Sequence, residues 1–171
     1  MEDLNRIETP PLLFAHRGGK ADAPENTMEA FKKALSNGSN GLESDAQLTK
    51  CGNVVLHHDR RFGHFFKRKA INKCELLNLP SSIPSLETFY SQIDGEYDFS
   101  IDVKDEKAIQ EILRVSKKYS FPMKKLWLCH PDIEKIALWR DLDESVRLVN
   151  STTLEGLKEG PERRIANLCE I

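Results

Sequence analysis

Acidic and basic side chains recur at two places in the sequence with a spacing that could hold a charged ligand. Glu43 and Asp45 lie two residues apart in an apolar run, and Asp102 and Lys104 repeat this spacing further along the chain. On a β-strand, residues two apart point to the same face of the sheet. Three carboxylates gathered together would repel one another unless a cation lay between them. Their oxygen atoms would suit a hard divalent cation, Mg2+ or Ca2+.

Two histidines add groups that could move protons. His16 stands beside Arg17, and His58 stands beside Asp59, each pair following an apolar run. Imidazole titrates near neutrality, so one histidine could accept a proton while the other donates one. His57 would point to the opposite face of a strand from His58, and periodicity alone does not choose between them.

Each of these motifs has a simpler interpretation when it is taken alone. A Glu-x-Asp pair on a strand is more often a solvated face, and a His-Asp pair is more often a local hydrogen bond. The joint arrangement favours a functional site, because successive predicted strands each bring polar residues to the same rim.

Short apolar runs alternate with amphipathic segments, which predicts the elements that position these groups. We expect strands at residues 12–15, 42–48, 54–58, 99–103, 126–129 and 146–149. We expect a first helix with Asn26 as its N-cap and Glu29 completing a capping box, and further helices at 85–93, 108–119, 133–142 and 160–171. This order predicts parallel strands in a barrel or a doubly wound sheet, whose carboxyl ends open onto one ligand-binding side.

Composition and charge narrow the class of protein. The chain has 171 residues, 30% of them charged, with 25 Lys and Arg against 27 Asp and Glu. A near-neutral chain gives no general attraction for nucleic acid. No apolar run reaches the roughly 18–20 residues that span a bilayer, and the first residues do not resemble a signal peptide. The four cysteines show no metal-ligand spacing, so we expect a reduced, cytoplasmic protein without a transmembrane segment.

The motifs taken together resemble those of the glycerophosphodiester phosphodiesterase family. They are, in order, Ala15-His16-Arg17-Gly18, Pro24-Glu25-Asn26-Thr27, Gly41-Leu42-Glu43-Ser44-Asp45, Val54-Val55-Leu56-His57-His58-Asp59, Ile83-Pro84-Ser85-Leu86-Glu87 and Ile101-Asp102-Val103-Lys104. The resemblance begins near residue 12 and covers most of the chain. It implies a (β/α)8 TIM barrel of the phospholipase C-like phosphodiesterase type. It also implies hydrolysis of glycerophosphodiesters to sn-glycerol 3-phosphate and an alcohol, with a divalent cation.

The resemblance also implies metal ligation by three carboxylates, Glu43, Asp45 and Asp102. Asp102 stands where the family more often has Glu, which shortens its reach by one methylene. The catalytic histidines implied are His16 and His58.

The cations that the resemblance assigns to the substrate phosphate are Arg17 and Lys104. A lysophospholipase D-like activity is an alternative with the same fold and chemistry. A catalytically silent barrel remnant that acts through protein contacts is an alternative of another class.

The length of the chain sets a further expectation. A (β/α)8 barrel typically needs about 250 residues, whereas residues 1–171 predict six strands. We therefore expect a single domain over 1–171 that lacks the last part of the barrel and that could self-associate through open sheet edges. The segment 60–69, RRFGHFFKRK, has five basic residues and three Phe. It is either a solvated loop with its Phe side chains tucked into the barrel or a contact for an anionic or lipid-like substrate.

Overall fold

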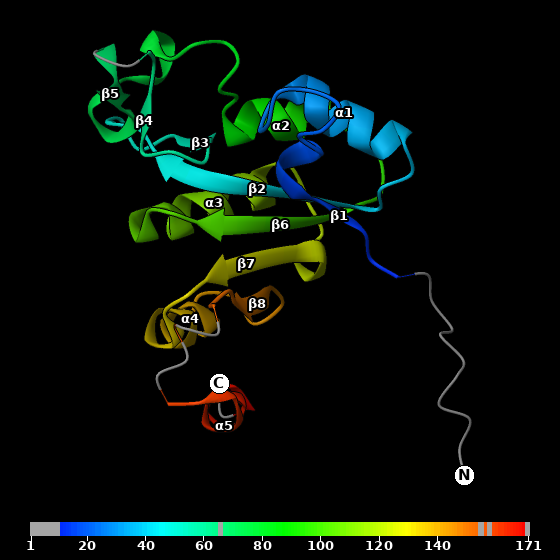
Figure 1. Ribbon diagram of the computed structural model, residues 1–171, viewed down its shortest axis with the longest axis vertical. Coiled ribbons are helices and arrows are strands. Elements are labelled where there is room, and N and C mark those ends of the chain that lie inside the picture. The colour runs from blue at the N-terminus through cyan, green and yellow to red at the C-terminus, as the bar shows by residue number, and fades with distance from the viewer. Residues whose placement is uncertain (1–10, 65–66, 154–155, 157–158, 170–171) are drawn as a thin grey trace.

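The computed structural model describes residues 11–64, 67–153, 156 and 159–169, which form one main sheet with helices packed around it (Figure 1). Five strands run parallel in the following order: β1 (Phe14–Ala15), β2 (Gly41–Leu48), β6 (Asp98–Val103), β7 (Leu126–His130) and β8 (Arg147–Asn150). A sixth strand, β3 (Val54–Leu56), pairs with β2 alone. The described residues therefore form part of a (β/α) barrel wall, with β1 and β8 at its two edges.

The α-helices follow the strands in alternation. They are α1 (Met28–Ser36), α2 (Leu86–Gln92), α3 (Ile109–Lys118), α4 (Ile133–Arg140) and α5 (Pro161–Cys169). Short 3-10 turns lie at His16–Gly18, Ile71–Lys73, Leu76–Asn78, Glu106–Ala108 and Met123–Lys125. Residues 170–171 of the predicted last helix lie outside the described residues. Among the described residues, no helix is both long enough and apolar enough to cross a membrane.

The start of α1 corrects one expectation. Thr27, and not Asn26, is the N-cap, because the Thr27 side chain accepts a hydrogen bond from the backbone N–H of Ala30 at 3.3 Å. Asn26 lies one residue earlier, has φ of 57° and is buried. Both residue types favour helix starts, so local preference could not separate them.

The third strand corrects a second expectation. β3 is antiparallel to β2, with Leu48 opposite Val54 and Ala46 opposite Leu56. The turn between the two strands is too short for the crossover that a parallel neighbour needs, so it can only close a hairpin. β3 also ends at Leu56, and His57 and His58 follow it.

Residues 59–64 and 67–74 form a small projection that we term the β4–β5 arm. It contains the two-stranded pair β4 (Arg61–Phe62) and β5 (Lys69–Ala70), and it lies beyond the carboxyl end of β2 in Figure 1. A separate apolar cluster of Val55, Ile71 and Ile83 fixes the arm to β3.

The main core lies between the sheet and helices α1, α2 and α3. Its centre is aromatic: Phe89 stacks on Phe99 with ring centroids 4.3 Å apart and meets Phe31 edge-on at 5.0 Å. All three side chains are fully buried. One continuous cluster of buried residues extends from Phe31 in α1 to Val146 beside β8, so one core supports every strand that carries polar residues to the rim.

A glycine controls the turn that follows β1. Gly18 has φ of 77°, and a Cβ placed there would lie 2.9 Å from both the Ala30 Cβ and the Phe31 Cδ1. The backbone around His16 and Arg17 therefore packs directly on α1, and it can do so only where residue 18 has no side chain.

We predict that Gly18→Ala lowers the free energy of unfolding by about 2–4 kcal/mol, since it adds a steric clash to left-handed strain. Gly38→Ala is the matched control, because Gly38 has φ of 92° with nothing within 4 Å of its added Cβ. It should cost about 1 kcal/mol from backbone strain alone. Urea unfolding measures both, and equal losses would contradict close packing at Gly18.

Candidate active site

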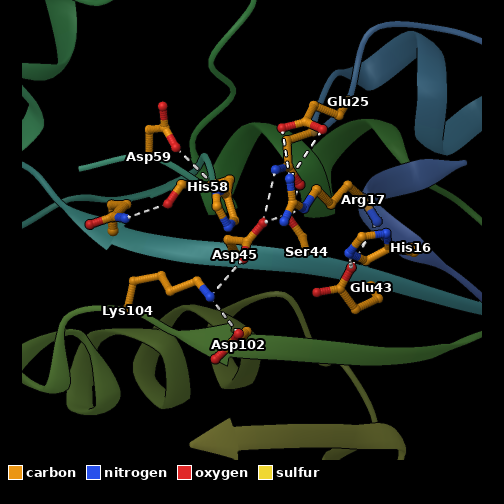
Figure 2. A network of polar contacts seen from close by, with 12 residues as sticks. His16, Arg17, Glu25, Glu43, Ser44, Asp45, His58, Asp59, Asp102 and Lys104 are labelled. Atoms are coloured by element: carbon orange, nitrogen blue, oxygen red, sulfur yellow. Dashed lines mark hydrogen bonds and ion pairs between the residues drawn. The ribbon is translucent and has the colours of Figure 1, made fainter. Parts of the chain in front are cut away.

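The sheet register brings the predicted carboxylates together. In the parallel pair β2 and β6, Asp45 lies opposite Asp102, and Glu43 lies opposite Ser100. Glu43 and Asp45 leave the same face of β2, as the two-residue spacing predicts. Figure 2 shows the three carboxylates along one side of these two strands. The Asp45 side chain is 2% exposed, so its negative charge needs compensation from the protein.

Lys104 supplies part of that compensation. Its Nζ lies 3.2 Å from Asp45 Oδ1 and 2.5 Å from Asp102 Oδ2, and it therefore bridges two strands (Figure 2). Burial alone would lower the pKa of Lys104, but the hydrogen bond to Asp102 and the two carboxylate charges outweigh burial and raise it. The ammonium group is therefore held in its charged form.

Arg17 supplies a second cation and a backbone donor. Its backbone N–H donates to Glu43 Oε2 at 2.7 Å, and its guanidinium meets both carboxylate oxygens of Glu25, at 3.0 and 3.2 Å. The Nε atom lies 3.4 Å from Asp45 Oδ2, but it is buried and has no hydrogen-bond partner among the described residues. Arg17 itself adopts a left-handed backbone with φ of 50°. Strain of this kind collects at functional sites, where the surrounding structure enforces it.

Asn26 is a site residue that the sequence analysis assigned to another role. Its Nδ2 donates to Asp45 Oδ2 at 3.1 Å, and its Oδ1 accepts from the Ser44 hydroxyl at 2.7 Å. Its backbone N–H donates to the Arg17 carbonyl at 2.9 Å. Asn26 therefore orients a buried carboxylate and the turn that carries Arg17. In the sequence, the feature that could have marked Asn26 as a site residue is its place within the Pro24-Glu25-Asn26-Thr27 motif.

Glu43 is the least compensated of the three carboxylates. Burial, with smaller contributions from the charges of Asp45 and Asp102, raises its pKa to about 7, although the backbone bond from Arg17 opposes this shift. His16 Nε2 lies 3.9 Å from Glu43 Oε2. A positive group near Glu43 would therefore stabilise its ionised form.

His58 approaches the cluster from the β3 hairpin. Its Nδ1 lies 2.9 Å from Asp59 Oδ1, and Arg68 holds the other oxygen of Asp59 at 2.6 Å. The hydrogen bond from His58 and then the one from Arg68 lower the pKa of Asp59. The His58 carbonyl accepts a hydrogen bond from Gln47 Nε2 at 3.1 Å. The neighbouring His57 lies against β2 through its backbone N–H, 2.8 Å from the Asp45 carbonyl, and burial lowers its pKa.

The structure thus gathers all seven predicted site residues around one rim. They are His16, Arg17, Glu43, Asp45, His58, Asp102 and Lys104. Within the described ranges, no three His, Cys, Asp or Glu side chains are arranged as a ready-made metal site. Lys104 engages oxygen atoms of Asp45 and Asp102 on the sides that face it. The three-carboxylate metal site stays a prediction.

Comparison with known proteins assigns the chain to a family. Residues 16–125 match the model of the glycerophosphoryl diester phosphodiesterase family, so the chain belongs to this family of hydrolases. A glycerophosphodiester phosphodiesterase of Caldanaerobacter subterraneus is 30% identical over 132 residues, which cover 64% of this chain and 54% of that relative. The chain therefore spans about half the length of this relative.

Solved structures agree on the fold. The glycerophosphodiester phosphodiesterase of Thermotoga maritima has a TM-score of 0.73 at 26% identity, with 88% of this chain and 69% of that one covered. A phosphodiesterase of Oleispira antarctica, solved with the product sn-glycerol-3-phosphate, has a TM-score of 0.76 at 21% identity, with 93% and 72% covered. The family resemblance and the TIM-barrel fold expected from the sequence are confirmed.

We predict that Asn26 and Ser44 act together in holding Asp45. Asn26→Gly keeps the left-handed backbone accessible and removes the side chain, so it should cost about 1–3 kcal/mol of unfolding free energy through unsatisfied buried groups. In a double-mutant cycle with Ser44→Ala, the coupling energy should be about 1 kcal/mol. Strict additivity in chemical denaturation would refute this hydrogen-bonded unit.

Proposed function

We propose that this chain hydrolyses glycerophosphodiesters to sn-glycerol 3-phosphate and an alcohol. The observation that carries the proposal is that two histidines, three carboxylates and two cations lie along one rim of a parallel sheet. Family membership supports the reaction class. The product in the Oleispira structure is the one that this reaction would release.

The cations Arg17 and Lys104 would neutralise the phosphodiester. A phosphodiester is an anion that repels nucleophiles, so fixed positive charge lowers the barrier as further charge develops. Both side chains are held by carboxylates on one side, Arg17 by Glu25 and Lys104 by Asp102. These contacts fix their positions before substrate arrives, so little reorganisation is needed.

The two histidines would move the protons. In the first step, the glycerol hydroxyl next to the diester attacks phosphorus and gives its proton to one histidine, while the departing alcohol oxygen takes a proton from the other. A cyclic phosphate results. Water then opens the cyclic phosphate with the two roles exchanged, which restores both histidines. The bond between His58 Nδ1 and Asp59 would orient the ring and leave Nε2 for the substrate.

A divalent cation, Mg2+ or Ca2+, fits the oxygen-rich side of this rim. Glu43 supports that fit, because it is a half-buried carboxylate that forms no ion pair with a Lys or Arg side chain among the described residues. Glu43 would hold the ion with Asp45 and Asp102. Once bound, the cation would supply positive charge to the phosphodiester.

We also propose that residues 1–171 act as one domain in the cytoplasm. The continuous core supports the single domain. The free thiols at Cys51, Cys74, Cys129 and Cys169 support a reducing compartment. Self-association through the edges of β1 and β8 would cover unpaired backbone groups, and sedimentation velocity would test it.

We predict that His16→Ala and His58→Ala each lower the kcat for glycerophosphocholine by about 100-fold or more, because each removes a proton-transfer group. The control is His64→Ala in the β4–β5 arm, an exposed histidine that should leave kcat within about twofold. Enzyme-coupled detection of glycerol 3-phosphate measures all three. A loss of a few fold or less at His16 or His58 would rule out its catalytic role.

We predict that removal of divalent cations with a chelator abolishes glycerol 3-phosphate release and that Mg2+ or Ca2+ restores it. Glu43→Ala should abolish the metal-dependent rate, since it removes a proposed ligand. Product release that persists at full rate in excess chelator would contradict metal dependence. A folded chain that releases no product from glycerophosphocholine or from lysophosphatidylcholine would favour the silent-barrel alternative, and release from the second alone would favour lysophospholipase D-like activity.

A further inference from the structure

A cavity of about 780 Å³ lies beside the proposed active site, between the β4–β5 arm and the carboxyl ends of β2, β6 and β7. Gln47 of β2 and His130 of β7 line it from the sheet side, and Lys73 and Cys74 line it from the arm. A cavity of this size accommodates a ligand the size of a small sugar phosphate or larger.

Positive charge dominates the lining. The arm contributes five cations, which are Arg60, Arg61, Arg68, Lys69 and Lys73. The opposite wall contributes Lys104 and Lys135, together with two acidic residues, Asp105 and Glu106. Glu106 is engaged by Lys135, and Asp105 accepts a hydrogen bond from the Lys107 backbone at the start of a 3-10 turn. The two acidic residues offset only part of the positive charge, because seven cations line the cavity against two carboxylates.

Four of the five arm cations that line the cavity have no counter-ion within the part of the chain that the structure describes. They are Arg60, Arg61, Lys69 and Lys73, which are exposed and form no ion pair with a described residue. By contrast, Arg68 on the same arm is held by Asp59 at 2.6 Å. Unpaired cations around a concave surface attract anions and focus the field inside it.

The cavity is continuous with the proposed catalytic rim through two shared residues. Lys104 lines the cavity and also lies 3.2 Å from Asp45 Oδ1. Gln47 lines the cavity and donates to the His58 carbonyl. A substrate whose phosphodiester lies at Lys104 could therefore extend directly into the basic cavity.

We propose that this cavity binds the alcohol moiety of the substrate and that the preferred alcohol carries a phosphate of its own. The proposal rests on the proposed function and specifies its substrate class. A phosphorylated polyol places two negative charges among Lys69, Lys73 and Arg60, whereas choline places a positive charge there. Four cations of the segment 60–69, which are Arg60, Arg61, Arg68 and Lys69, would thus face an anionic substrate, in line with the second interpretation of this sequence. Phe65 and Phe66 lie outside the described residues.

The test compares two glycerophosphodiesters with opposite alcohol charge. Glycerophospho(inositol 4-phosphate) carries an anionic alcohol and glycerophosphocholine a cationic one. In the double variant Lys69→Gln with Lys73→Gln, kcat/KM should fall about tenfold or more for the first substrate and stay within about twofold for the second. Raising the salt concentration should reduce the preference of the unaltered chain, since exposed charges are screened.

The matched control is Lys32→Gln with Lys124→Gln. It makes the same change in net charge at two exposed lysines that do not line the cavity, and it should leave both substrates within about twofold of the unaltered chain. A fall for the anionic substrate in this control equal to that in the cavity variant would overturn the proposal, because net charge would then explain it. Equal falls for the two substrates in the cavity variant would also overturn it.

Calorimetry of the binding of free inositol 4-phosphate separates this proposal from the proposed function. If the folded chain hydrolyses neither substrate, the proposed function fails and the cavity is judged on binding alone. Weaker binding to the Lys69→Gln, Lys73→Gln variant than to the control supports an anion site in the cavity. Equal binding by the two variants, or no binding by the unaltered chain, refutes it.

Discussion

The mutual repulsion of three carboxylates on adjacent parallel strands is the constraint around which this rim is built. Asp45 is nearly inaccessible to water, and three side chains from different elements contact it: Lys104 after β6, Arg17 after β1, and Asn26 before α1. An uncompensated buried charge would cost several kcal/mol, so these contacts are needed for the sheet to form with this sequence. Glu43 receives less compensation, and burial raises its pKa to about 7.

The same constraint explains where the backbone is strained. Arg17 and Asn26 both adopt left-handed conformations that side chains disfavour. The Asn26 N–H bonds to the Arg17 carbonyl, and Gly18 packs on α1 immediately afterwards. Each strained residue thus stabilises the other while it directs a polar group at Asp45. In the proposed reaction, this rigidity would place the phosphate-binding cation before the substrate arrives.

The β2–β3 hairpin adds a second level of organisation. It reverses the chain at the carboxyl end of β2, so it brings His58 back beside the carboxylates and projects the β4–β5 arm beyond the end of β2. Arm residues then share a cavity with Lys104 after β6 and His130 of β7. The short turn between β2 and β3 therefore positions both a proposed catalytic histidine, His58, and the arm residues that form one wall of the basic cavity. Chemistry on phosphorus and recognition of the alcohol would then be adjacent, with Lys104 common to both.

The sequence by itself determined the groups that share a face and the family to which they belong. The two-residue spacing of Glu43 and Asp45 requires a common face on any strand, and the ordered motifs identified the family because each depends on short-range order alone. Tertiary structure decided which distant groups meet. The bridge made by Lys104, the contact of Asn26 with Asp45 and the cavity beside the arm all depend on contacts between segments far apart in the chain. Periodicity and capping preference describe neighbours along the sequence, so they could place Asn26 at a helix start but could not show that it orients a carboxylate on another element.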